Sequence, residues 1–488
     1  MSLAISKSYG KQFIAGVWKD GSSGKTYQDL NPYNNEVVAT FILGNETDVD
    51  EAYSAAKEAQ KAWKETSVEA KKQVLMRAAE LLEQRKDEVA AIMIKETGSS
   101  MAKAQIEIKN SAGIIRAAAQ YPELMTNPRV NPSVIPGKEN LIYHVPVGVI
   151  GVISPFNFPL VLSMRSVAPA IATGNAVVLK PDIQTAVSGG LVIAEIFEEA
   201  GLPKGVLNVL TVDIADIGDY FIAHPVPKVI SFTGSTAVGR HVGEVASRNL
   251  KRVSLELGGN SPFVVLEDAD LEKALSAALF GKFFHQGQIC MITNRIFVHR
   301  SLYDQFVSSF VERAQKIPYG DPSVDPNVFI GPIINEKQMQ KVLNVIEAGK
   351  TEARLVLEGQ RIGNVLTPFV FADAKNDSTL AQTEIFGPVA TIIPFDTEEE
   401  ALALANDTPY GLSASVFTSD LERGIEFARH IESGMAHVND QTINDDPNAP
   451  FGGEKASGLG RFNGEWIFEE FTTRKWVSVQ REYRDFPF

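Results

Sequence analysis

The chain has 488 residues, which is too long for one ordinary hydrophobic core and favours two or three domains. Hydrophobic residues make up 44% of it and charged residues 22%, which is typical of a folded protein and excludes a repeat array or a disordered chain. The formal charge of −14 at pH 7 argues against a nucleic acid partner, because that kind of binding depends on basic patches.

Membrane and metal partners are also not expected. No apolar run reaches the roughly 18 residues of a membrane span, and the N-terminus lacks the basic and apolar regions of a signal peptide. We therefore expect a cytoplasmic protein, although the sequence does not show whether Met1-Ser2-Leu3 is native. The 7 histidines are scattered, without an H-E-x-x-H pair or a carboxylate cluster, so we predict no metal site.

The elements predicted in chain order begin with an amphipathic helix that runs across Val74 to Val89 with one buried face. From Val147 the chain changes to short apolar runs separated by helical stretches. These runs cover residues 147–153, 176–179, 206–210, 228–232 and 253–257. Their alternation with helices predicts a parallel sheet that is covered on both faces.

The same alternation restarts after Gly258-Gly259 and predicts a second α/β unit. Its elements are a strand at 263–266, a helix at 271–284, a strand at 296–299 and a helix at 303–317. Two further β segments, 141–145 and 475–479, are separated from these units. They can pair with each other or with another subunit.

Cys290 is the only cysteine, so it cannot form an intrachain disulfide. Its alternatives are a buried small hydrophobe, an incidental surface thiol and a nucleophile. The segment before it, residues 284–289, is polar and contains Gly287, which is not typical of a cysteine that serves only for packing.

Two strand ends indicate a dinucleotide. The segment that contains Gly234 and Ser235 follows a strand and opens a helix, where backbone N–H groups and the helix dipole can receive a phosphate. An ordinary turn with a serine cap is the alternative. Lys180 ends a buried strand, the edge at which open α/β sheets bind ligands, and is otherwise a solvated strand end.

Glu256 and Asn157 can each be interpreted as a catalytic residue or as a structural one. Glu256 lies in an apolar run before two glycines, where burial would raise its pKa towards that of a general base; the alternative is an outward-facing glutamate. Asn157 lies in a rigid turn and is either an oxyanion donor or a turn-forming residue. We interpret His285 as a structural polar residue.

Together these residues resemble the aldehyde dehydrogenase superfamily over nearly the full length of the chain. The spacing of 34 positions from Glu256 to Cys290 and of 23 from Asn157 to Lys180 matches the arrangement in that superfamily. The motifs that carry the resemblance are Pro155-Phe156-Asn157-Phe158-Pro159, Val177-Val178-Leu179-Lys180-Pro181, Phe232-Thr233-Gly234-Ser235, Glu256-Leu257-Gly258-Gly259, Gly287-Gln288-Ile289-Cys290, Glu384-Ile385-Phe386-Gly387-Pro388 and Pro450-Phe451-Gly452-Gly453.

The resemblance implies an α/β fold with three parts. Residues 1–120 and 146–257 would form a Rossmann-like dinucleotide-binding domain, and 258–460 a second α/β domain that carries the thiol. Residues 121–145 and 470–488 would form a small β arm for assembly into a homodimer or homotetramer.

The resemblance also implies a mechanism. Cys290 attacks a small-molecule aldehyde, while Asn157 and the Cys290 backbone N–H hold the oxyanion of the thiohemiacetal. Hydride passes to C4 of the nicotinamide of NAD, and Glu256 activates the water that hydrolyses the resulting thioester. The residues implied at the cofactor are Lys180 for the adenosine ribose, Ser235 for the pyrophosphate, Glu384 and Phe386 for the nicotinamide ribose, and Ser154, Phe156, Gly234 and Leu257 around them.

The substrate implied by the resemblance is an aromatic aldehyde. Segments 162–166 and 438–445 look most like benzaldehyde and vanillin dehydrogenases, and an apolar slot is expected from Phe158, Leu162, Ile289 and Met291. Arg165 either meets a ring substituent or lies on a helix surface. The alternatives are an aliphatic aldehyde or semialdehyde dehydrogenase, an acylating enzyme that uses coenzyme A, and an inactive structural oligomer.

Two departures from the superfamily pattern limit what the resemblance implies. Many relatives that prefer NAD place a glutamate three residues after the lysine, where this chain has Ile183, so use of NADP stays open. Some relatives carry a glutamate directly after a Gly-Arg pair near the C-terminus, as a proton relay. Here Gly460-Arg461 is followed by Phe462, so such a relay must run otherwise.

Overall fold

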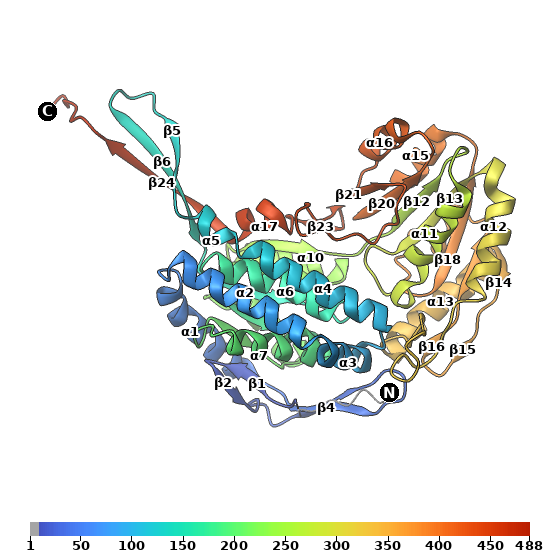
Figure 1. The fold of residues 1–488 in the computed structure, drawn as a ribbon, viewed down its shortest axis with the longest axis horizontal. Coiled ribbons are helices and arrows are strands. Elements are labelled where there is room, and N and C mark those ends of the chain that lie inside the picture. Colours follow the sequence, from blue (N-terminus) through green and yellow to red (C-terminus); the bar gives the residue numbers. More distant parts are fainter. Residues whose placement is uncertain (1–8) are drawn as a thin grey trace.

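A computed structural model describes residues 9–488. Met1-Ser2-Leu3 and the rest of the first eight residues of the predicted dinucleotide-binding domain lie outside this range. The chain forms two α/β units, each built on its own sheet, and a β arm that projects from the first unit (Figure 1). The predicted α/β fold class is therefore confirmed.

The first sheet has eight strands in the order β2-β1-β9-β8-β7-β10-β11-β23. Five of these strands, β9-β8-β7-β10-β11, run parallel to their neighbours. Ile153 pairs with Lys180, and Thr233 with Glu256, so four strands end at one edge of the sheet. The strands are β1 Gln12–Ile14, β2 Val17–Lys19, β7 Val149–Ile153, β8 Ala176–Lys180, β9 Leu207–Val209, β10 Val229–Thr233, β11 Arg252–Glu256 and β23 Gly458–Leu459.

Helices cover both faces of this sheet. Val177 and Leu179 of β8 pack into the apolar cluster under α2, α3, α4, α6 and α7, whereas Ala176 and Val178 pack into the cluster under α1 and α10. Because alternate residues point to opposite faces, a strand buried on both sides reads as an unbroken apolar run. The helices are α1 Glu46–Trp63, α2 Val68–Gln84, α3 Lys86–Thr97, α4 Met101–Ala118, α6 Pro159–Ala172, α7 Val192–Glu199 and α10 Thr236–Arg248.

The single helix predicted across Val74 to Val89 is wrong, because the chain breaks at Arg85 into α2 and α3. Arg85 has φ −96° and ψ 13°, outside helical geometry. Its guanidinium donates to Glu88 and Glu195, each at 2.9 Å. The amphipathic pattern continues across the break because both helices bury a face against the same cluster.

The second sheet has seven strands in the order β14-β17-β18-β13-β12-β20-β21, and all except β14 run parallel to their neighbours. Separate apolar clusters lie on its two faces. The strands are β12 Ser261–Val265, β13 Thr293–His299, β14 Arg354–Leu357, β17 Phe369–Ala372, β18 Val389–Phe395, β20 Ser413–Phe417 and β21 Met435–Val438, and the helices are α11 Leu271–Phe283, α12 Arg300–Ala314, α13 Glu336–Glu352, α15 Glu398–Asn406 and α16 Leu421–His430.

The β arm consists of β5 Arg129–Pro132, β6 Lys138–Pro146 and β24 Thr472–Gln480 in the order β24-β6-β5. β24 pairs antiparallel with β6 from Thr472 opposite Pro146 to Gln480 opposite Lys138. The two separated β segments thus pair with each other within one chain. The outer edge of β24 has no partner strand among residues 9–488.

Shorter elements complete the described chain, and none of its helices is long and apolar enough to cross a bilayer. They are β3 Thr26–Leu30, β4 Val37–Ile42, α5 Tyr121–Leu124, the 3-10 turn η1 Ile183–Thr185, the π-helical turn η2 Val187–Leu191, α8 Ile214–Ile217, α9 Tyr220–Ala223, the 3-10 turn η3 Phe284–Gly287, β15 Arg361–Ile362, β16 Val365–Leu366, α14 Thr379–Gln382, β19 Tyr410–Gly411, β22 Glu454–Lys455 and α17 Gly464–Phe471.

Candidate active site

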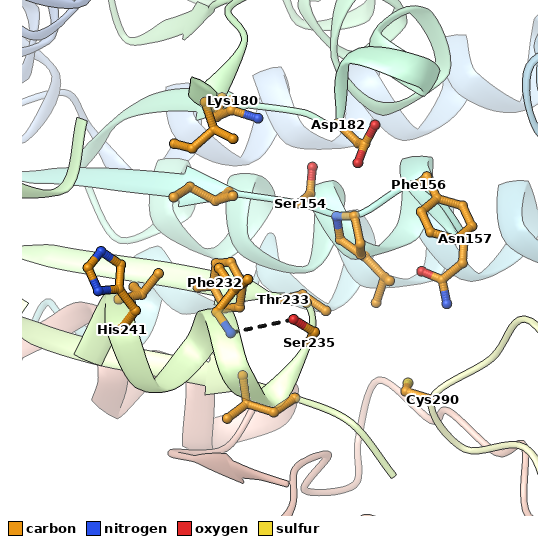
Figure 2. Close-up of a pocket in the computed structure, with 18 of the residues that line it drawn as sticks. Ser154, Phe156, Asn157, Lys180, Asp182, Phe232, Thr233, Ser235, His241 and Cys290 are labelled. Atoms are coloured by element: carbon orange, nitrogen blue, oxygen red, sulfur yellow. Dashed lines mark hydrogen bonds between the residues drawn. The ribbon is translucent and has the colours of Figure 1, made fainter. Parts of the chain in front are cut away.

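Two cavities meet at Cys290. The larger, of about 500 Å³, lies at the carboxyl ends of β7, β8 and β10, and the smaller, of about 260 Å³, lies beyond the cysteine. Cys290, Asn157 and Leu162 line both cavities. Figure 2 shows the larger cavity with Asn157 and Cys290 at one end and His241 at the other.

Lys180 ends β8 and turns its side chain into the larger cavity. It is buried, with an exposed fraction of 7%, and donates only to the carbonyl of Pro181, at 3.2 Å, among the described residues. Burial lowers the pKa of the Lys180 ammonium, and the carboxylates of Asp182 and Asp213 oppose that shift. The structure therefore places Lys180 at a strand end that lines a cavity, and its contact with a ligand stays a prediction.

Ser235 and Gly234 line the same cavity where β10 passes into α10. The Ser235 hydroxyl caps the helix by accepting from the Val238 N–H at 3.4 Å (Figure 2). The serine cap proposed as the structural alternative is therefore real, but it does not remove the residue from the cavity. The first N–H groups of a helix, with the positive end of its dipole, favour an anion at this position.

Glu384 and Phe386 line the cavity near Cys290, on the loop before β18. Glu384 accepts from the Gly259 N–H at 3.0 Å through one oxygen, and burial raises the pKa of its carboxyl group. A Cβ at Gly258 would lie 2.6 Å from its other oxygen, so a larger residue there would displace the Glu384 carboxylate. Phe386 has φ +55° and meets the edge of Phe156 at 6.0 Å.

The remaining residues expected at the cofactor, Ser154, Phe156 and Leu257, also line this cavity. At its far end the lining is apolar, from Ile214, Ile222, Val238 and Val242. These features fit a dinucleotide. The apolar slot suits a base, and the buried Lys180 and the N-terminus of α10 suit phosphate and ribose groups. Glu384 has one oxygen that accepts no hydrogen bond from residues 9–488 and can accept one from a ligand.

The loop that carries Cys290 has an unusual backbone. His285, Gln286 and Gly287 have φ values of +50°, +55° and +76°, three left-handed residues in a row. The Gln286 amide donates to the carbonyls of Gly98 at 3.3 Å and Pro332 at 3.0 Å, which holds the loop in place. A Cβ at Gly287 would lie 2.3 Å from the Gly387 carbonyl, so the glycine of the cysteine motif is a packing requirement.

Cys290 is half-buried between the cavities, and its backbone closely approaches Gly259. Burial and the carboxylates of Glu256 and Glu384 raise the pKa of the Cys290 thiol to about 12. A raised pKa favours the protonated thiol over the thiolate. It needs a proton acceptor or a nearby positive charge to become a nucleophile.

Glu256 lies at the end of β11, between β10 and β23, with an exposed fraction of 2%. The outward-facing alternative is therefore wrong. Neither carboxylate oxygen has a hydrogen-bond partner within residues 9–488. Burial raises its pKa to about 8, against the lowering effects of Arg165 and Arg461. Glu256 itself does not line either cavity, but it is the charged group that most strongly raises the pKa of the Cys290 thiol.

Asn157 lies in the turn before α6 with an exposed fraction of 4%. Its Nδ2 donates to the Gln288 carbonyl of the cysteine loop at 3.1 Å. That bond ties the amide to the nucleophile's own loop and leaves a second N–H of the same nitrogen for an oxyanion.

The smaller cavity is aromatic and contains all the predicted substrate residues: Phe158, Leu162, Arg165, Ile289 and Met291. It also contains three rings that the sequence did not point to, Phe280, Phe284 and Phe451. Its polar rim comes from Gln441, Asn444 and Asp445. Such a lining suits a flat apolar ligand.

Arg165 is buried inside the molecule, so the interpretation as a helix-surface arginine is wrong. Every residue of α6 is buried, and any side chain on that helix is therefore internal. The guanidinium pairs with Asp445 and lies 3.7 Å from the centre of the Phe451 ring. Its Nε and Nη1 have no hydrogen-bond partner among the described residues.

His285 is buried and lines neither cavity. Its ring meets the edge of Phe158 at 5.6 Å. Burial lowers the pKa of the imidazole, with a further lowering from Lys103, so it stays neutral. This placement agrees with a structural polar residue.

The family model described as "Aldehyde dehydrogenase family" matches residues 18–477. The chain belongs to the aldehyde dehydrogenase family. Benzaldehyde dehydrogenase YfmT of Bacillus subtilis is 50% identical over 98% of both chains, and vanillin dehydrogenase of Corynebacterium glutamicum is 48% identical over 96% of this chain and 98% of that one. The crystal structure of an NAD-dependent benzaldehyde dehydrogenase from Corynebacterium glutamicum has a TM-score of 0.89 and 45% identity, covering 96% of this chain and 98% of that one.

This aldehyde dehydrogenase also contains, beside the smaller cavity, a buried ion pair that the sequence did not predict. Lys103 and Glu107 of α4 are both fully buried and paired, and Lys103 lies 4.4 Å from the centre of the Phe158 ring. Glu107 accepts from the N–H groups of Leu160 at 2.7 Å and Val161 at 3.1 Å, which fixes the start of α6. Their spacing of four residues was the only local signal, and it is equally typical of an exposed helix face.

Proposed function

We propose that this enzyme oxidises an aromatic aldehyde to the carboxylic acid with NAD. The observation that carries the proposal is the place of Cys290, where a cavity that fits a dinucleotide meets an aromatic cavity. The relatives named for benzaldehyde and vanillin, and the NAD-dependent benzaldehyde dehydrogenase of known structure, support the same chemistry.

In this proposal Cys290 is the nucleophile. Its thiol gives its proton to a water molecule in the cavity, and the thiolate sulfur attacks the aldehyde carbon. The Asn157 amide and the Cys290 backbone N–H donate to the oxyanion, a contribution worth about 3 to 4 kcal/mol of barrier for one such donor. The bond from Asn157 to the Gln288 carbonyl supports this role, because it positions the amide without using both of its hydrogens.

A bound NAD supplies the hydride acceptor that converts the thiohemiacetal into a thioester. Glu256 then takes a proton from water, and the hydroxide that forms attacks the thioester, releasing the acid and the Cys290 thiol. A pKa of about 8 supports this assignment, since such a carboxylate is basic enough to accept a proton and still partly ionised near neutral pH. Arg165 and Arg461 keep the ionised form accessible.

The substrate class follows from the smaller cavity. Phe158, Phe284 and Phe451 offer ring faces and edges to an aromatic aldehyde, with about 260 Å³ of space. Arg165 also lines this cavity and would meet a polar ring substituent through its guanidinium. Lys180, Ser235 and Glu384 would hold the adenosine ribose, pyrophosphate and nicotinamide ribose of the cofactor, with Ser154, Phe156, Gly234 and Leu257 around it.

The domain roles belong to the same proposal. Residues 1–120 and 146–257 would bind the dinucleotide, 258–460 would carry the thiol, and 121–145 with 470–488 would assemble a homodimer or homotetramer. The open edge of β24, with Trp476 65% exposed, supports assembly through the arm. A cytoplasmic location would keep the catalytic thiol reduced.

The test is a dinucleotide-reduction assay across benzaldehyde, vanillin, acetaldehyde, a medium-chain aldehyde and succinate semialdehyde. We expect the two aromatic aldehydes to have the highest kcat/KM, with NAD as the better cofactor. Addition of coenzyme A should leave the acid as the product, because Glu256 favours water as the acyl acceptor. Preferential formation of an acyl-coenzyme A, or reduction of NAD only with aliphatic aldehydes, would contradict the proposal.

A further inference from the structure

The Asp182 carboxylate lies in the dinucleotide cavity next to Lys180 (Figure 2). One oxygen, Oδ1, accepts from the backbone N–H of Gln184 at 2.9 Å and from its side-chain amide at 3.3 Å, which begins the turn η1. The other oxygen, Oδ2, accepts no hydrogen bond from residues 9–488. The backbone thus fixes the carboxylate through one oxygen and leaves the second for a ligand.

Lys180 and Asp182 line the same cavity as the apolar slot formed by Ile214, Ile222, Val238 and Val242. Both Asp182 and Asp213 are close enough to Lys180 to raise the pKa of its ammonium against the effect of burial. Asp213 directly precedes Ile214, which belongs to the apolar slot. A ribose attached to a base in that slot therefore falls beside Lys180 and Asp182.

Ile183 lies three residues after Lys180, where many relatives that prefer NAD have a glutamate. Its side chain does not line the cavity. It is half-buried and packs against the apolar cluster of the first sheet. A carboxylate is nevertheless present in the cavity, one residue earlier in the chain. The loop η1 presents Asp182 to the ligand and turns the next side chain to the protein.

We propose that Asp182 selects NAD over NADP. Its Oδ2 accepts a hydrogen bond from a hydroxyl of the adenosine ribose, and its negative charge repels the phosphate that NADP carries on that ribose. This inference rests on the proposed use of a nicotinamide dinucleotide.

The charges around the ribose position strengthen the discrimination. Lys180 contributes one positive charge, and Asp182 and Asp213 contribute two negative charges, so a phosphate meets an excess of negative charge. The other side chains of the described residues that line the cavity and can carry a positive charge are Lys341 and His241. The charge of Lys341 acts on Glu384, and His241 contacts Asp219, a further carboxylate of the cavity, at 2.6 Å. No arginine from the described chain lines the cavity to receive a ribose phosphate.

The experiment is calorimetric titration of the full chain with NAD and with NADP, which needs no turnover. The variants are Asp182→Asn and Asp182→Ser, which remove the charge but keep a side chain able to cap η1. We expect the ratio of Kd for NADP to Kd for NAD to fall about tenfold in both, which corresponds to about 1.4 kcal/mol. Asp182→Glu, which keeps the charge, should retain the preference of the parent chain.

A matched control is Asp420→Asn. Asp420 also uses one carboxylate oxygen as a cap, at the start of α16, where it accepts from the Arg423 N–H at 3.1 Å. It lies on the second α/β unit, outside the cavity. Its ratio of dissociation constants should equal that of the parent chain. A ratio that stays within twofold of the parent in Asp182→Asn and Asp182→Ser would overturn the role of Asp182. A parent chain that binds neither dinucleotide would instead contradict the proposed function.

Discussion

The two cavities that meet at Cys290 are built in different ways. Many of the residues that line the larger one come from the ends of neighbouring parallel strands or directly follow them, such as Lys180 on β8 and Thr233 on β10. The residues that line the smaller one come from α4, α6, α11, the cysteine loop and the loop around Asp445. Sheet topology therefore determines the first cavity, whereas packing between distant segments determines the second.

The cavities also differ in whether their charged side chains are paired within the protein. The carboxylates of Glu384 and Asp182 in the larger cavity each use one oxygen on the protein and leave the other open. In the smaller cavity, Arg165 is paired with Asp445, and Glu107 with Lys103. A site for a polar cofactor keeps its hydrogen-bonding groups available, while a site for an apolar substrate neutralises its buried charges internally.

The largest effect is expected where the cavities meet. Cys290→Ala should lower kcat by more than about 10⁴-fold, because both cavities remain but the only thiol is lost. NAD binding by calorimetry should be close to that of the parent chain. Substantial steady-state turnover by this variant would refute the assignment of the nucleophile.

Glu256→Gln should lower kcat by about 10²- to 10³-fold by slowing deacylation. Acylation at Cys290 should persist, so that rapid-quench measurements show a burst of NADH of about one equivalent per active site. A variant that loses the burst and the steady rate equally would show that Glu256 acts first on the thiol. Either result separates its effect on the thiol from its effect on water.

Asn157→Ala should lower kcat by about 10²-fold or more and change KM little, because the amide is expected to bind the oxyanion more strongly than the ground-state carbonyl. Asn157→Asp is a stricter comparison, since it preserves the shape but places a negative charge beside the oxyanion. If kcat is unchanged and only KM rises, the residue serves the substrate cavity alone.

Arg165→Met tests whether charges in the smaller cavity are paired for stability. It should lower the free energy of unfolding in urea by about 3 kcal/mol, because Asp445 is left buried without its cation. The double variant Arg165→Met with Asp445→Asn should recover most of that loss, since Asn463 still provides a partner for residue 445. Equal destabilisation in the single and double variants would show that stacking on Phe451, and not charge pairing, is the dominant contribution.

The smallest effect is a pH dependence. Because burial raises the Glu256 pKa to about 8, the active carboxylate form is lost as pH falls through that value, and kcat should decline up to tenfold per pH unit below it. The decline should be absent in Glu256→Gln when rates are followed at several pH values. A parent profile that is flat from pH 6 to 9 would contradict the assigned base.

Much of the larger cavity was predictable because its determinants are local. Lys180 ends a strand that the apolar runs marked, Ser235 lies two residues beyond the end of another, and parallel strands bring such ends to one edge. The break at Arg85 was not predictable, since the amphipathic pattern continues through it and the Arg85 guanidinium bonds to Glu195 of a distant helix as well as to the nearby Glu88.

The sequence by itself determined that this protein has an α/β fold with a single thiol, and which strands end together at one edge of the first sheet. Only the tertiary structure decided that Arg165 is buried against Asp445, that Glu107 holds the start of α6, and that Asp182 instead of Ile183 faces the cofactor cavity. The physical reason is that strand periodicity and glycine turns act over a few residues, whereas ion pairing and the direction of a loop side chain depend on segments that meet only after folding.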